Sequence, residues 1–195
     1  MTDQPFDDLS RRVQRIEDLL EIQQLAVRYA MAVDERDVDA WVNLFVPDVE
    51  AGKGGVGRPA LRDFITAQLR LFYRSIHQIV GHRIDPLSSD RASGSVYCRA
   101  EHEVGKRWIV VALRYDDDYR KVGGAWYFAR RTDKHWYEAD VNDWPQHVSF
   151  HGWPDAPRRP LLPEPSDCWS AFWHGADTSA ITSVPLSDDG TCLDL

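Results

Sequence analysis

A carboxylate stands at the point where an apolar helix is expected to end. Apolar residues at helical spacing lead up to it: Leu19, Ile22, Ala26, Tyr29 and Val33. From Val27 onward the other faces become apolar as well, which indicates that this end of the helix enters the interior. Asp34 follows this stretch. Because the helix macrodipole places partial negative charge there and burial penalises an ionised carboxylate, Asp34 needs a partner that is, or can become, cationic.

Histidine can both pair with such a carboxylate and move a proton near neutral pH. The chain contains seven histidines: His77, His82, His102, His135, His147, His151 and His174. His77 and His82 lie in one strand-like segment but differ in parity, so a regular strand turns at most one of them toward the helices. The alternation does not decide which one. A loop position for Asp34, or a purely structural role for His77, is the plain alternative.

The composition excludes several classes of protein. A net charge of −8 and a pI near 5.3 argue against a nucleic-acid surface, which needs a basic patch. No stretch reaches the length of a membrane span, and the polar N-terminus lacks a signal core, so we expect a cytoplasmic protein. The three cysteines are widely spaced and form no C-x-x-C motif, which argues against a disulfide framework or a thiolate metal site.

Three helices are expected before any long strand, at about residues 10–34, 38–45 and 60–73. Ser10 and Asp37 are suited to cap the first two, and Pro59 to open the third. A short strand over residues 49–51 is a further possibility. The apolar positions predict these core-facing residues: Val13, Ile16, Leu20, Trp41, Leu44, Phe45, Leu61, Phe64, Ile65, Leu69 and Phe72.

Four long segments rich in β-branched and aromatic residues follow, over residues 75–87, 91–104, 107–121 and 125–139. Turn-forming residues separate them, and the short connections indicate hairpins. The order predicts an α+β fold: three helices packed on the concave face of a curved, mainly antiparallel sheet. We expect the acidic run 116–118 to be a solvated turn or strand end.

Residues 141–195 differ from the rest, because they hold most of the prolines and four of the eight tryptophans. Proline at this density prevents long helices and central strands, while the aromatic content is too high for a disordered tail. We therefore expect two parts: a domain over residues 1–140, and an extended arm over 141–195 that packs on the domain or on a neighbouring subunit. His147 and His151 have the spacing of helical metal ligands, but Gly152 and Pro154 make a helix there doubtful.

Several short motifs occur in a characteristic order. Tyr29 and Asp34 end the first helix within Val33-Asp34-Glu35-Arg36, Trp41 follows, Ser75-Ile76-His77 comes after the third helix, and residues 124–131 read G-x-W-x-F-x-x-R. This order resembles the SnoaL-like group of the nuclear transport factor 2-like superfamily, whose domains are cone-shaped and α+β. Its lyases are the nearest in pattern: scytalone dehydratase, bile-acid dehydratases and hexachlorocyclohexane dehydrochlorinase. The resemblance covers about residues 10–140.

The resemblance implies a role for each residue of the site. His77 would be the general base, and Asp34 would orient its ring and stabilise the imidazolium. Arg131, rather than its neighbour Arg130, would stabilise a developing negative charge. The substrate-binding residues would be Tyr29, Trp41, Tyr73 and Arg131. No metal or organic cofactor is implied, and the expected partners are an apolar cyclic small molecule and further copies of the chain, in a dimer or trimer.

The same fold leaves other functions open. A polyketide-cyclase-like enzyme could use the same acid–base pair, and a non-catalytic ligand-binding or assembly module could use the fold without it. The distinguishing feature is whether Asp34 and His77 meet inside a pocket.

Overall fold

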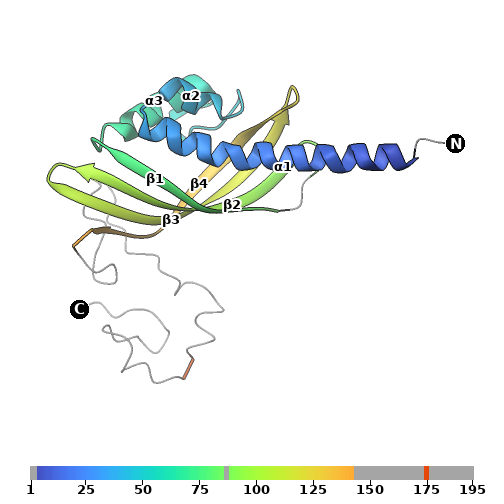
Figure 1. Cartoon of the computed structure of the whole chain (residues 1–195). Helices are drawn as coiled ribbons and strands as arrows, with labels where there is room; N and C mark the ends of the chain where they lie inside the picture. Colours follow the sequence, from blue (N-terminus) through green and yellow to red (C-terminus); the bar gives the residue numbers. More distant parts are fainter. Residues whose placement is uncertain (1–3, 86–87, 143–173, 176–195) are drawn as a thin grey trace.

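The computed structural model describes residues 4–85, 88–142 and 174–175. The elements are α1 (Gln4–Asp34), α2 (Val38–Asn43), the short 3-10 helix η1 (Gly52–Gly54), α3 (Arg58–Leu69), β1 (Ser75–Ile84), β2 (Arg91–Val104), β3 (Arg107–Val122) and β4 (Ala125–Asp140). The strands form one antiparallel sheet in the order β1-β2-β3-β4, and the helices lie on one of its faces (Figure 1). This arrangement confirms the predicted α+β fold, with a curved antiparallel sheet that carries three helices.

Helix α1 begins earlier than predicted. It starts at Gln4 rather than near Ser10, because Pro5 and Asp7 both suit a first helical turn. Its N-terminal half extends beyond the sheet (Figure 1). The residues Val13, Ile16 and Leu20, predicted to face the core, are 44–57% exposed, so this part of the prediction is wrong.

The connection from α1 to α2 is tight and well capped. Asp37 accepts a hydrogen bond from the backbone N–H of Ala40 at 2.8 Å, as expected of an N-cap. Arg36 has a φ of 62°, a left-handed conformation that is uncommon for a residue other than glycine. The chain therefore reverses direction directly after Asp34.

Helices α2 and α3 close one end of the core. Trp41, Leu44 and Phe45 are buried as predicted, and the ring of Phe45 lies 5.2 Å from that of Phe128 in β4. Helix α3 carries Pro59 in its first turn, as expected, but it ends at Leu69.

One helix face and one strand were predicted incorrectly in this region. Leu61, Ile65 and Leu69 are buried at i, i+4 spacing, whereas Phe64 lies off that stripe and is 48% exposed. The strand suggested over residues 49–51 is reduced to a single bridge between Glu50 and Val56.

The hairpins of the sheet follow the expected turn chemistry. Gly123 and Gly124, between β3 and β4, both have positive φ (59° and 89°). Val122 and Ala125 pair on either side of them, which is the two-residue connection that favours glycine at both positions. Residues 105–106 make the corresponding turn between β2 and β3.

A bulge in β1 corrects the parity argument. Ile79 pairs with Cys98 and Gly81 pairs with Tyr97, so Val80 is left without an opposite residue. The extra residue shifts the alternation of the residues after it by one position. Both His77 and His82 therefore face the helices. The prediction that at most one of them does so is wrong.

The core has two parts on the helical side of the sheet. One is centred on Tyr119, Trp126 and Phe128 beneath all three helices. The other runs along β2 and β3 and includes Ala26 of α1. Within the described residues, no helix is long and apolar enough to cross a membrane. The predicted arm lies almost entirely outside the described residues.

Candidate active site

Asp34 and His77 meet where α1 ends and β1 begins. The His77 ring nitrogen Nδ1 lies 2.7 Å from Asp34 Oδ1, and the backbone N–H of His77 donates to Oδ2 at 2.8 Å. The Ser75 hydroxyl donates to Oδ1 at 2.8 Å. The His77 side chain is 7% exposed and that of Asp34 is 24% exposed. The two side chains therefore have the contact that an Asp–His pair needs, while their catalytic role stays a prediction.

The hydrogen bonds assign the proton on His77. Burial alone raises the pKa of Asp34, but the hydrogen bonds from His77 and Ser75 outweigh it and hold this pKa below its usual value. An ionised carboxylate only accepts hydrogen bonds, so Nδ1 of His77 carries the hydrogen. In the neutral ring Nε2 then keeps its lone pair, which is the state that a general base needs.

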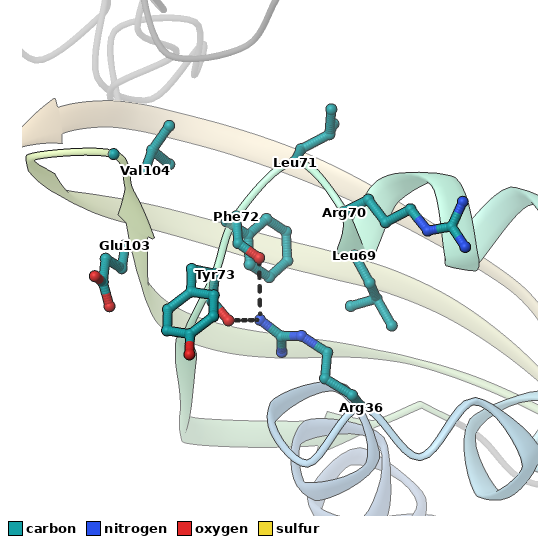
Figure 2. A pocket seen from close by; sticks show the side chains of 9 residues that line it. Arg36, Leu69, Arg70, Leu71, Phe72, Tyr73, Glu103 and Val104 are labelled. Atoms are coloured by element: carbon teal, nitrogen blue, oxygen red, sulfur yellow. Dashed lines mark hydrogen bonds between the residues drawn. The ribbon is translucent and has the colours of Figure 1, made fainter.

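Arg36 and Ser75 support this pair and were not predicted as site residues. The Arg36 guanidinium donates to the Ser75 hydroxyl oxygen at 2.9 Å and to the Val33 carbonyl at 2.6 Å. Figure 2 shows the same group reaching the carbonyls of Phe72 and Tyr73. Because Ser75 accepts from Arg36, its own hydrogen is directed at Asp34. Ser75 lies two residues before His77 in the same strand, so the sequence could have predicted that both face the same side. Nothing in the sequence indicates the left-handed backbone of Arg36.

His102 of β2 lies beside the pair. Its ring centroid is 5.4 Å from that of His77 and 4.5 Å from that of Phe72. Burial, and then the neighbouring charge of His77, lower the pKa of His102 to about 3. His102 therefore stays neutral at neutral pH, and it adds no positive charge beside the ring of His77.

Arg131 lies on the same face of the sheet, in a separate buried ion pair. Its Nε and Nη2 donate to the two carboxylate oxygens of Asp117 at 2.8 and 2.7 Å. The rings of Tyr29, Tyr115 and Phe128 lie within 4.1–4.3 Å of its guanidinium carbon. Burial opposes the charge, but Asp117 outweighs it and raises the pKa of Arg131. The third nitrogen, Nη1, has no hydrogen-bond partner among the described residues.

Asp117 also anchors a chain of hydrogen bonds to β1. The Tyr119 hydroxyl donates to Asp117 at 2.8 Å, and Nε2 of His82 lies 2.9 Å from the same hydroxyl. Asp117 is only 2% exposed, so the expectation of a solvated acidic run is wrong at this position. The reason is strand alternation: the middle residue of the run faces inward, while Asp116 and Asp118 face away.

The predicted binding residues fall into two places. Tyr29 and Trp41 contact each other, with ring centroids 5.6 Å apart, and Tyr29 covers Arg131. Tyr73 is 75% exposed and lies apart from them. It lines a pocket of about 340 Å³ together with these residues: Arg36, Leu69, Arg70, Leu71, Phe72, Glu103, Val104 and Gly105 (Figure 2). Asp34 and His77 are not among the residues that line this pocket.

No group of three or more histidine, cysteine, aspartate or glutamate side chains could hold a metal ion in the part of the chain that the structure describes. His147 and His151, considered above as metal ligands, lie outside that part.

The sequence profile of the SnoaL-like domain matches residues 14–132. Uncharacterized proteins of Mycobacterium tuberculosis and Mycobacterium bovis are 33% identical to this chain over 129 residues, which is 62% of this chain and 87% of theirs. Their descriptions give no activity.

Solved structures show the same fold. A protein of Novosphingobium aromaticivorans, provisionally described as an aromatic ring hydroxylase, is 29% identical with a TM-score of 0.56, over 65% of this chain and 94% of its own. A provisional scytalone dehydratase of the same species is 22% identical with a TM-score of 0.59, over 69% and 94%. A hexachlorocyclohexane dehydrochlorinase of Novosphingobium barchaimii is 20% identical with a TM-score of 0.61, over 69% and 97%.

Proposed function

The chain belongs to the SnoaL-like domain family, and from this premise we propose that it is a cofactor-independent lyase or isomerase for an apolar cyclic small molecule. The observation that carries the proposal is the 2.7 Å contact between Asp34 and His77, with a carboxylate that two further donors hold in place. Two of the structural neighbours have names that denote elimination reactions, loss of hydrogen chloride and loss of water. At their identity they establish the fold alone, so the reaction class is our proposal.

The proposed reaction begins at Nε2 of His77. This nitrogen takes a proton from a carbon of the substrate, and the electrons of the broken C–H bond form a double bond to the neighbouring carbon. In a lyase, the bond from that neighbour to a halide or hydroxyl group breaks, and the group leaves with the electron pair. In an isomerase, the neighbouring carbon is a carbonyl carbon whose π electrons move onto its oxygen to give an enolate. The imidazolium then returns the proton to another carbon conjugated with the enolate, and the carbonyl double bond forms again. Asp34 stabilises the imidazolium in both cases.

The surroundings suit an apolar substrate that gains negative charge. The sheet face next to His77 is apolar, with Cys98, Ala100, Val111 and Leu113 on β2 and β3. Nη1 of Arg131 is the donor left to stabilise developing charge, because the other two nitrogens are held by Asp117. Burial would otherwise weaken such a charged donor, and Asp117 keeps it protonated.

The test combines a compound panel with heavy water. The full chain is incubated in D2O with cyclic secondary alcohols, alkyl halides and ketones, and mass spectrometry detects loss of water or hydrogen halide, or gain of deuterium. We expect one class to react with the native protein. We expect His77→Gln to remove nearly all turnover and Asp34→Asn to lower it by about 10²–10⁴-fold, because the ring loses its tautomer support.

His174→Gln is the matched control, since His174 is exposed and far along the chain from the pair. It should react like the native protein. A compound that binds tightly but is unchanged in all four proteins would identify a binding module instead. Turnover that survives His77→Gln would show that another group is the base.

A further inference from the structure

The N-terminal half of α1 carries an apolar stripe with no partner among the described residues. Every side chain described from Phe6 to Glu17 is exposed, although the helix continues unbroken into the core. Five large apolar side chains on it are 44–71% exposed: Phe6, Leu9, Val13, Ile16 and Leu20. An isolated helix of this length is marginal in water, so a stripe of this size indicates a packing partner.

The spacing of the stripe identifies the kind of packing. The five residues follow alternating steps of three and four, which is the a/d pattern of a heptad repeat. The stripe keeps a repeat of 3.5 residues, whereas a helix on a globular core has a broader apolar face with a period of 3.6. Such a narrow seam is typical of a helix that packs lengthwise against another helix.

We propose that the occupant of this seam is the same stripe of a second copy of the chain, in a parallel two-stranded coiled coil. With Phe6 at position a and Leu9 at position d, Arg12 occupies position g of the same heptad. Glu17 occupies position e of the next heptad. These positions meet across a parallel pair, so the dimer forms two ion pairs, each between Arg12 of one copy and Glu17 of the other. Neither residue forms an ion pair within the described chain.

The antiparallel arrangements lack this complementarity. When Val13 packs beside Ile16 of the second copy, Arg12 faces Leu19 and Glu17 faces Ser10. Shifting the helices by one heptad in either direction brings two Arg12 side chains or two Glu17 side chains together, and like charges oppose pairing. The charge pattern therefore selects the parallel orientation.

The attachment of α1 to the sheet leaves the seam accessible. Asp18 is bound by Lys121 at 2.6 Å and by the Trp126 indole at 2.9 Å, and Glu21 accepts from the backbone of Trp126. Asp18 lies at heptad position f and Glu21 at b, on the side of the helix away from the a/d stripe. The sheet thus holds α1 by one side, while the apolar side chains of the stripe over residues 6–20 stay exposed.

Charge exchange in the full chain tests the seam. Sedimentation velocity and light scattering measure mass over a range of protein concentrations. The native protein should be dimeric at high concentration, and Ile16→Glu should be monomeric. Arg12→Glu and Glu17→Arg should each weaken dimerisation by about tenfold, because two attractive contacts become repulsive. The double variant should recover native dimerisation. Arg11→Glu, at position f, is the control and should leave the mass unchanged.

Circular dichroism confirms that each variant is folded, and a mixture of the two single variants gives a second readout. Arg12→Glu and Glu17→Arg chains should prefer to form heterodimers, because both like-charge contacts of either homodimer become contacts between a glutamate and an arginine. A native protein that is monomeric at all concentrations overturns the proposal. The proposal is also overturned if the double variant dimerises no more strongly than the single variants. Ile16→Glu that keeps its mass but loses hydrogen-exchange protection in residues 143–195 would assign the stripe to the arm instead.

Discussion

Three donors converge on the carboxylate of Asp34, and each has a separable effect. The His77 backbone N–H donates to Oδ2 and the His77 ring donates from Nδ1 to Oδ1. The Ser75 hydroxyl also donates to Oδ1, and Arg36 fixes the direction of that hydroxyl. Burial works against the charge, and the donors overcome it. The charge of Asp34 therefore depends in part on Ser75, which does not contact the ring of His77.

Ser75→Ala tests this support at the level of one hydrogen bond. The variant removes a donor that lowers the pKa of Asp34, so this pKa should rise toward or above its usual value. Carboxyl-carbon NMR of labelled aspartate, followed during an acid titration, measures the change without any substrate. In the proposed lyase, the acid limb of the pH–rate profile should move to higher pH and turnover should fall about tenfold.

Ser95→Ala is the control for that experiment, because Ser95 donates to the partly exposed Asp116 on the neighbouring strand. It should leave the titration of Asp34 unchanged. An Asp34 titration that is the same in Ser75→Ala and the native protein would show that Ser75 contributes nothing to the charge.

His102 links the pH to the free energy of unfolding. In the folded protein its pKa is about 3, against 6.5 for an unperturbed histidine. Between these values the unfolded chain binds one proton more than the folded chain, so stability falls as the pH falls through this window. A difference of one bound proton changes the free energy of unfolding by about 1.4 kcal/mol per pH unit.

In His102→Gln, the free energy of unfolding should fall less steeply as the pH is lowered, and the slope should decrease by up to this amount. Urea unfolding at several pH values between 4 and 6.5 measures it, and the slope rather than the absolute stability is compared. His174→Gln, an exposed histidine, should keep the native slope. Equal slopes in all three proteins would mean that His102 is not held neutral.

At the scale of elements, the sequence predicted the order of helices and strands well. It predicted less well which side chains of each element face the core. Hydrophobic spacing located α2, α3 and the four strands, and turn residues located the hairpins. The bulge at Val80 was invisible, because it depends on how β1 pairs with β2 and not on its own alternation. Residues after such a bulge change face relative to a regular strand.

The candidate site shows the same division. The structure places Asp34 against His77 and turns Arg131 rather than Arg130 inward, while the roles assigned to these residues stay predictions. Arg36 could not be predicted, since its contacts depend on a left-handed backbone at the end of α1. Asp117 was missed because an acidic run in sequence suggests solvent, whereas strand alternation buries its middle member.

The attachment of α1 to the sheet gives an element-scale prediction. Asp18 is buried and accepts from Lys121, Trp126 and Gln14. Asp18→Ala leaves the Lys121 ammonium and the Trp126 indole N–H without their acceptor, so it should lower the free energy of unfolding by about 3 kcal/mol. Thermal and urea unfolding measure the loss.

The exposed pair between Asp8 and Arg11, on the same helix, is the internal comparison. Asp8→Ala should cost less than about 1 kcal/mol, because solvent screens the pair. Similar losses for both variants would mean that Asp18 does not hold α1 to the sheet.

At the scale of the whole molecule, α1 connects features that the sheet keeps apart. His77 lies on β1 and Arg131 on β4, which are the two edges of the sheet. Helix α1 contacts both regions, with Tyr29 over Arg131 and Asp34 on His77. A displacement of α1 along its axis would therefore disturb the contact of Asp34 with His77 and the contact of Tyr29 with Arg131 together.

The convex face of the sheet leads to the final prediction. Val110 and Ala139 pair across β3 and β4 and are 4% and 5% exposed, although they alternate with residues that face the helices and belong to neither core cluster. The expected arm from Val141 onward, which lies almost wholly outside the described residues, is the predicted cover.

A chain ending at Asn142 should bind more of a hydrophobic dye, exchange amide hydrogen faster at residues 109–111 and lose about 2–3 kcal/mol of stability. It should keep the coiled-coil dimer, because the seam on α1 is untouched. Unchanged exchange and stability in the shortened chain would show that the arm does not cover this face.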